Sequence, residues 1–262
     1  MGCMVKVWVC VILVVTLGIC GPAGHMQAGD LLELRLDTFD LYRVDMGEAL
    51  VSLRERLQLA QGRVAIAFES LPAHESGQGT ISLSVRDGRV RDILDRLCLA
   101  DPRYTWELVE GRLIYVYPKN GAADPAGLLD IRIAHLKVRG RYWPEAIISH
   151  IPSYCAELGE FLESKSREWA RKHNRLTLGS AGSILTTNVP PPWLELELWN
   201  ATVREVLIAI SLYTLRHGDL RAGQVRKPEG PAVMAPVGWW YEFRVDPDAS
   251  TGVGGYPTWR PF

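Results

Sequence analysis

The stretch ISLSVRDGRVRDILDRL, residues 81–97, decides the fold. Apolar residues occupy every second position from Ile81 to Val85, and this period of two predicts a strand with one buried face. From Val90 to Leu97 the apolar residues recur three and four positions apart, which predicts an amphipathic helix. Only a short polar turn separates the two patterns. The sequence therefore predicts a strand that leads almost directly into a helix.

The chain carries this pattern a second time, as LELELWNATVREVLIAI at residues 194–210. A shift of 113 residues places Ile81 on Leu194 and Asp87 on Asn200 without a gap. In the second copy, Thr202 and Glu205 have the spacing of a capping box. Any two strand–helix junctions share some similarity by chance. The ungapped register favours an internal duplication over that alternative.

The elements around the first copy predict an α+β unit over residues 38–118. Their order is β-α-β-β-α-β-β, in which two helices can cover one face of a small mixed sheet. The predicted elements are a strand at 39–44, a helix at 45–61, strands at 64–68 and 81–85, a helix at 90–98, and a hairpin of strands at 104–108 and 113–117.

This unit resembles the short N-terminal domain of secretins and TonB-dependent receptors. The resemblance lies in a strand opening with Phe39-Asp40, a helical turn Glu48-Ala49-Leu50, the aliphatic step Ile93-Leu94, and a closing strand Leu113–Val116. The long loop from Pro72 to Gly79 departs from the family pattern. The resemblance implies a periplasmic interaction module without catalytic residues, found at the entrance of secretins and signalling receptors.

A second unit of the same type is predicted at residues 128–246, after a Gly- and Pro-containing linker at 119–127. We expect it to contain an insertion at 152–192 and to end in a single closing strand over Trp239–Val245. The tail at 247–262 lacks periodicity, which predicts a loose end. The other expected elements are strands at 129–133, 184–187 and 194–198, and helices at 143–148, 154–173 and 203–215.

The first 28 residues predict a signal peptide or a signal anchor. The run from Val5 to Cys20 is almost wholly apolar, and its continuous part is too short for a comfortable membrane span. Leu17–Cys20 is similar to a bacterial lipobox, although Ile19 stands where a small residue is usual, so lipidation stays an alternative. We therefore expect export to the periplasm or cell envelope. There Cys98 and Cys155 could form a disulfide, or Cys98 could be a buried thiol on its helix.

Composition and motifs exclude several functions. The 262 residues carry a net charge of −1, which gives no general attraction to nucleic acid or anionic membranes. We therefore expect membrane contact only through an uncleaved or lipidated N-terminus. Neither a metal-ligand spacing nor a nucleophile elbow occurs, so the sequence predicts no metal, no cofactor and no catalytic residues.

Two functional hypotheses follow. The first is a non-catalytic protein–protein interaction module of the cell envelope, whose partner is a secretin-like or receptor assembly. Its proposed contact surface is Trp239, Trp240 and Tyr241, because neighbours in a strand point to opposite faces and one tryptophan should face outward. The alternative is that an inserted loop or the tail covers that tryptophan. The second is an envelope enzyme or polysaccharide-binding protein with a site at residues 145–175. That site would use His150, Glu157, Glu160 and His173.

Overall fold

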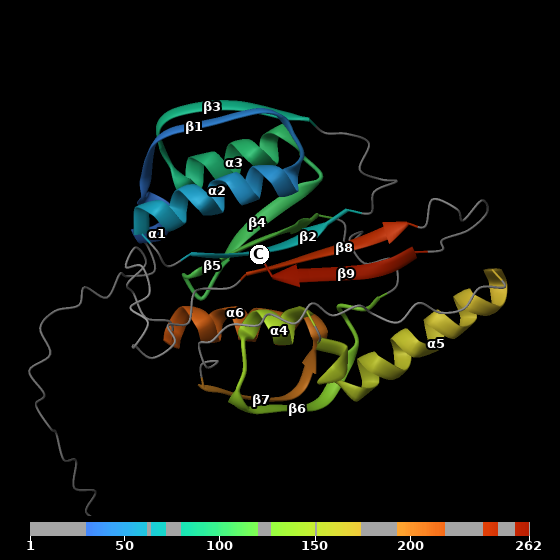
Figure 1. Ribbon diagram of the computed structural model, residues 1–262. Helices are drawn as coiled ribbons and strands as arrows, with labels where there is room; N and C mark the ends of the chain where they lie inside the picture. The colour runs from blue at the N-terminus through green and yellow to red at the C-terminus, as the bar shows by residue number, and fades with distance from the viewer. Residues whose placement is uncertain are drawn as a thin grey trace, which may run out of the picture.

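The protein is described from a computed structural model, and its class is α+β, as the sequence predicts. The structure describes residues 30–61, 64–71, 80–119, 127–149, 151–173, 193–217, 238–245 and 255–261. Figure 1 shows these residues as stacked layers. An outer ribbon of two strands lies at the top, helices follow, and a five-stranded sheet occupies the middle. Further helices and a second two-stranded ribbon lie below that sheet.

The first half of the chain contains the predicted elements in the predicted order. Helix α2 begins after Asp45, whose Oδ1 accepts a hydrogen bond from the Glu48 amide at 2.8 Å. The apolar stripe of α2, with Leu50, Leu53 and Leu57, is fully buried. The elements are α1 (Asp30–Glu33), β1 (Arg35–Val44), α2 (Met46–Gln61), β2 (Ala65–Ser70), β3 (Ile81–Arg89), α3 (Val90–Ala100), β4 (Tyr104–Val109) and β5 (Leu113–Pro118).

The second half repeats much of this order and adds α5, which extends away from the stack (Figure 1). Its first strand differs from the prediction, because Leu129 and Asp130 form a turn and the strand runs from Arg132 to Arg141. The predicted strand at 184–187 lies outside the described residues. The elements are β6 (Arg132–Arg141), α4 (Pro144–Ser149), the 3₁₀ turn η1 (Ile151–Ser153), α5 (Ala156–His173), β7 (Trp193–Thr202), α6 (Val203–His217), β8 (Trp239–Val245) and β9 (Gly255–Pro261).

Strand β9 corrects the prediction of a loose tail at 247–262. It pairs antiparallel with β8 in a register that places Pro257 opposite Phe243 and Pro261 opposite Trp239. The second half therefore closes with a hairpin, like the first. The prolines obscured the strand in the sequence. They are tolerated because β9 is the last strand of its sheet, and an edge strand has one side without ladder hydrogen bonds.

The central sheet belongs to both halves of the chain. Its strand order is β4-β5-β2-β8-β9, and β2 pairs in parallel with β5 of the first half and with β8 of the second. Ala67, for example, lies opposite Tyr115 on one side and Trp239 on the other. The sequence predicts one small sheet in each unit. Instead the two units share this sheet, and β2 joins them.

Each face of the shared sheet is covered by one half of the molecule. Ile66 and Phe68 of β2 belong to the hydrophobic cluster with α2 and α3, whereas Ala65 and Ala67 belong to the cluster with α4 and α6. Val64–Phe68 is accordingly an uninterrupted apolar run, as is typical of a strand that is buried on both faces. Such a run predicts a strand, but does not reveal what covers each face.

The two strand–helix junctions have the same backbone geometry. Asp87 and Asn200, which the 113-residue shift aligns, both adopt the left-handed conformation, with φ values of 47° and 49°. Asp and Asn tolerate this conformation better than most residues that carry a Cβ atom. The predicted capping box is also present in the second copy. The Thr202 amide donates to Glu205 Oε2 at 2.7 Å, and the Glu205 amide donates to Thr202 Oγ1 at 3.2 Å.

The contacts around the two junctions also match. Arg35 Nη1 donates to the carbonyl oxygen of Asp87 at 3.0 Å, and Arg132 Nη1 donates to that of Asn200 at 2.9 Å. The first helical amides, of Val90 and Val203, donate to backbone carbonyls just before β1 and β6, at 2.9 and 3.0 Å. The equivalence predicted from sequence therefore extends to backbone conformation and to tertiary hydrogen bonds.

Candidate functional site on the outer ribbon

Trp239 and Tyr241 of the proposed contact surface lie in the core and Trp240 is half-buried, which corrects the sequence prediction. Trp239 and Tyr241 are both 0% exposed, and they pack on the face covered by α4 and α6. Trp240 points to the opposite face, where it makes an edge contact with Phe68 at 5.2 Å between ring centroids. Adjacent residues do alternate between faces, as predicted. Neither faces outward, because β8 is an inner strand with a helical layer on each side.

Cys98 and Cys155 are free thiols in two different hydrophobic clusters, so the disulfide left open by the sequence is absent. Cys98 lies on α3 and packs against the first hydrophobic cluster, whereas Cys155 is buried between η1 and α5 in the second half. Burial raises the pKa of Cys98 to about 11 and that of Cys155 to about 12. Both thiols are therefore protonated and weakly nucleophilic at neutral pH.

The site proposed in the insertion finds little support among the residues described. Glu157 Oε1 accepts the amide of Ala134 on β6 at 3.0 Å, and this hydrogen bond lowers the pKa of Glu157. Glu160 is exposed on α5. His150 and the side chain of His173 lie outside the described residues. Within the described part of the chain, no group of three or more His, Cys, Asp and Glu side chains could hold a metal ion.

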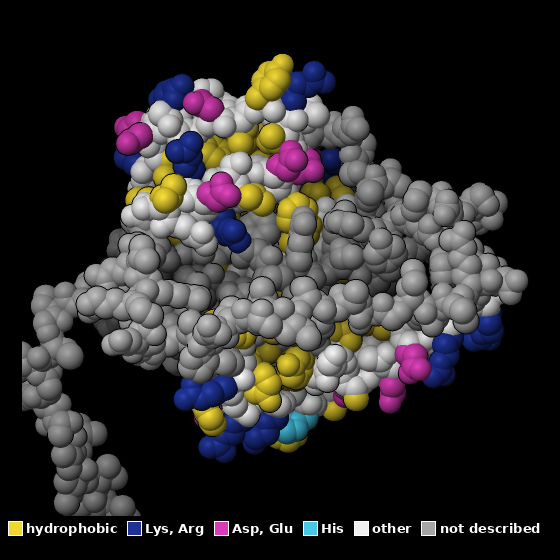
Figure 2. All heavy atoms as spheres, viewed as in Figure 1, with side chains coloured by type: hydrophobic (Ala, Val, Ile, Leu, Met, Phe, Trp, Pro, Cys, Tyr) yellow, Lys and Arg dark blue, Asp and Glu magenta, His cyan; other side chains and the backbone are white. Residues whose placement is uncertain are grey.

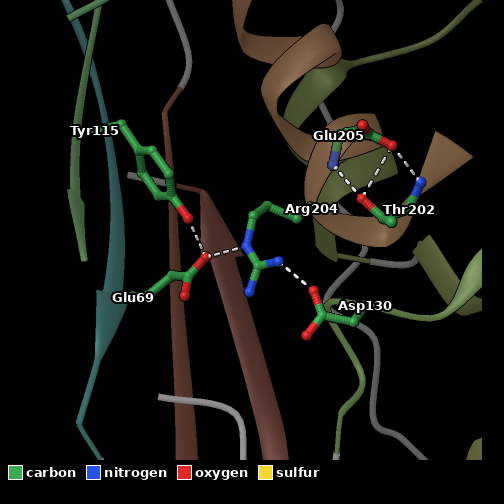
Figure 3. A network of polar contacts seen from close by, with 6 residues as sticks. All are labelled: Glu69, Tyr115, Asp130, Thr202, Arg204 and Glu205. Carbon is green, nitrogen blue, oxygen red and sulfur yellow. Dashed lines mark hydrogen bonds and ion pairs between the residues drawn. The ribbon is translucent and has the colours of Figure 1, made fainter. Parts of the chain in front are cut away.

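A buried polar network fastens the two halves together (Figure 3). The Tyr115 hydroxyl donates to Glu69 Oε1, and Arg204 Nε donates to the same oxygen at 2.6 Å. A second nitrogen of Arg204 bonds Asp130 on the turn before β6. Figure 3 shows Tyr115 and Arg204 approaching Glu69 from opposite sides. The network thus links β2 and β5 to α6.

The electrostatics of this network indicate a structural role. Burial and then the negative charge of Glu69 raise the pKa of the Tyr115 hydroxyl. Burial alone would lower the pKa of Arg204, but the hydrogen bond and charge of Glu69 outweigh burial and raise it. Tyr115 therefore stays neutral and Arg204 stays charged at neutral pH. A group that holds its protonation state so firmly is poorly suited to proton transfer.

Among the residues that the structure describes, the outer face of the β6–β7 ribbon exposes two tryptophans beside a row of charged side chains. Four cross-strand pairs line it: His135–Trp199, Lys137–Glu197, Arg139–Glu195 and Arg141–Trp193. The tryptophans at its two ends, Trp193 and Trp199, are 53% and 68% exposed. In Figure 2, basic side chains gather along the lower edge of the molecule, beside the imidazole and exposed hydrophobic side chains. This face, defined by these eight residues, is called the outer ladder.

Contacts within the outer ladder hold its side chains in place. The rings of His135 and Trp199 stack, with centroids 3.7 Å apart and planes 13° apart. The carboxylate of Glu197 is shared between His135 Nε2 at 3.0 Å and Lys137 Nζ at 3.1 Å. The hydrogen bond from Lys137, followed by that from His135, lowers the pKa of Glu197. Arg139 Nε lies 3.5 Å from Glu195 Oε1.

The β1–β3 ribbon shows what the fold itself requires at these positions. There the pair Thr38–Arg86 replaces His135–Trp199, and Asp40–Ser84 replaces Lys137–Glu197. Ser84 Oγ donates to Asp40 Oδ1 at 2.6 Å, so neither of these two pairs contains an aromatic side chain, although Tyr42 on the same strand is 80% exposed. The fold therefore does not demand an aromatic residue at position 199. The sequence prediction did not include Trp199. Aligning the two copies by 113 residues places this tryptophan at the position of Arg86, and this difference is the signal that could have revealed it.

Comparisons with known proteins find no match. No protein-family model matches the chain, and no curated protein or solved structure matches it. Over the residues that the structure describes, no helix is both long and apolar enough to cross a membrane. The functional argument therefore depends on the outer ladder and on its difference from the β1–β3 ribbon.

Proposed function

We propose that this chain is an exported, non-catalytic protein–protein interaction module of the bacterial cell envelope that docks through the outer ladder. The observation that carries the proposal is the exposure of Trp193 and Trp199 on one ribbon of a repeated arrangement, where the 113-residue shift aligns them with Thr80, just before β3, and with Arg86. Tryptophan and arginine are the residues most enriched at the energetic centres of protein interfaces. The apolar leader and the resemblance to the short N-terminal domain support export and a place in the envelope.

The geometry of the outer ladder suits docking better than catalysis. It is the exposed outer face of a ribbon, and the carboxylates of Glu195 and Glu197 pair across the strands with Arg139, Lys137 and His135. The stacked His135 ring and the shared Glu197 carboxylate limit side-chain motion, so less rotamer entropy is lost when a partner binds. A preorganised and partly aromatic face of this kind can recognise a protein surface.

The experiment is site-specific photocrosslinking in the native host. A photoreactive amino acid replaces Trp199 in one strain and Arg86 in another, which places the same probe on the outer ladder and on the equivalent β1–β3 position. We expect a protein adduct from position 199 and little or none from position 86, with both adducts sought in the envelope fraction. Equal labelling from both positions, or none from position 199, would contradict docking through this face.

A further inference from the structure

We propose that the partner of the outer ladder is a second copy of this chain, with the two ribbons packed face to face about a two-fold axis parallel to the strands. The inference rests on the proposed function, because it names the protein that this face contacts. The argument comes from the order of charges along the two strands.

The outer ladder separates its charges into two rows. The β6 row carries the positive charges of Lys137, Arg139 and Arg141, with the imidazole of His135 at one end. The β7 row has a carboxylate or an indole opposite each of them, Trp199, Glu197, Glu195 and Trp193. The β6 row and the β7 row of the outer ladder are thus complementary in charge. A surface with this property can recognise a copy of itself through an isologous contact.

Only one two-fold orientation matches these rows. An axis between the faces and parallel to the strands places the β7 row of each copy over the β6 row of the other, with positions along the strands preserved. Glu197 then faces Lys137 of the second copy, and Glu195 faces Arg139. A two-fold axis perpendicular to the strands instead places the β6 row of one copy over the β6 row of the other, so that like charges face each other. The charge pattern therefore specifies the orientation as well as the partner.

The lysine and arginine side chains of the β6 row have more hydrogen-bond donors than their contacts within the ribbon use. A lysine ammonium has three donor hydrogens and an arginine guanidinium has five. Lys137 can therefore donate to Glu197 of its own chain at 3.1 Å and to the carboxylate of a second copy. At the ends of the ladder, the indole of Trp193 would lie over Arg141 of the second copy, an arrangement that favours cation–π attraction.

The size of the face indicates a weak, concentration-dependent dimer. A two-stranded ribbon is about 10 Å wide, and a standard stable interface buries about 800 Å² on each partner, which this face alone cannot supply. The β1–β3 ribbon lacks the same pattern, since Asp40 lies opposite Ser84 and Thr38 lies opposite Arg86. We therefore expect dimerisation through one ribbon only and no growth into longer assemblies.

The test is sedimentation equilibrium of the protein recovered from the envelope fraction, over a range of protein concentrations and at two ionic strengths. We expect a reversible monomer–dimer equilibrium that weakens at high salt. Lys137→Glu should weaken the dimer at least tenfold, because a carboxylate would then face Glu197. The exchange Lys137→Glu with Glu197→Lys should restore the dimer, because the rows remain complementary after the swap. Asp40→Lys on the other ribbon is the matched control and should leave the dimer unchanged.

Circular dichroism of each variant separates loss of association from loss of folding, and the charge exchange provides a second check. A folded wild-type protein that stays monomeric at all concentrations would overturn the inference, as would an exchange variant that fails to dimerise while folded. The crosslink from position 199 separates the two proposals. An adduct of twice the chain mass supports both, and an adduct with a different protein overturns only the dimer. Absence of any adduct removes both.

Discussion

Glu69 and Arg204 form an ion pair between the two halves of the molecule, with Arg204 Nε 2.6 Å from Glu69 Oε1 and a separation of 135 positions along the chain. The side chain of Glu69 is only 4% exposed. The pair therefore fastens the shared sheet to α6 from within the core. Its contribution can be measured by removing one partner.

Arg204→Leu should lower the free energy of unfolding by about 3 kcal/mol, because it leaves the buried Glu69 carboxylate without its cation. The matched control is Arg216→Leu, which removes an exposed ion pair with Glu110 and should cost less than about 1 kcal/mol. Urea unfolding of both variants measures the difference. Equal losses would show that the network does not fasten the halves.

Gly47→Ala should destabilise the protein, by about 1–3 kcal/mol, through overpacking. A Cβ atom at position 47 would lie 2.1 Å from Cη2 of Trp240, a distance that demands movement of the indole. The double variant Gly47→Ala with Trp240→Leu should show a smaller cost from the alanine than the single variant does. Thermal unfolding of the four proteins in this cycle measures the coupling, and additive costs would disprove the contact.

The left-handed junction predicts a difference between two substitutions at Asn200. Asn200→Val should cost about 1–2 kcal/mol more than Asn200→Gly, because a side chain with a Cβ atom is strained at a φ of 49° and valine is also branched there. The same pair of substitutions at Asp87 should show the same order. If valine and glycine are equally tolerated at either position, the junction does not have this conformation in solution.

The half-buried thiol of Cys98 and the buried thiol of Cys155 predict a loss of stability at alkaline pH. Their pKa values in the folded protein, about 11 for Cys98 and about 12 for Cys155, exceed the usual value near 9. The unfolded chain therefore releases these protons first, so stability is fully present below pH 9 and falls as pH rises toward 11 or 12. The native thiols should also react slowly with iodoacetamide at pH 8. Cys155→Ala should flatten the decline in stability above pH 9, and an unchanged decline would contradict this explanation.

Local patterns revealed more of the fold than of the surface. The alternation at Ile81–Val85 and the helical spacing after Val90 were enough to find both copies of the junction. They could not show that β2 pairs with β8, because that contact joins distant segments. For the same reason the sequence pattern predicts a contact surface at Trp239–Tyr241, and the structure corrects this prediction. Alternation shows that neighbours face opposite sides of a strand, and only the tertiary structure shows that both sides are covered.

The shared strand β2 has a practical consequence for anyone who divides the gene. A fragment that stops before residue 127 would turn Ala67, Leu113 and Tyr115 toward water, since their cover comes from the second half. A fragment that starts there would lack the strand beside which Trp239 lies. The repeated order of elements therefore does not imply that either half folds alone, and expression of the whole chain is the sounder route to soluble material.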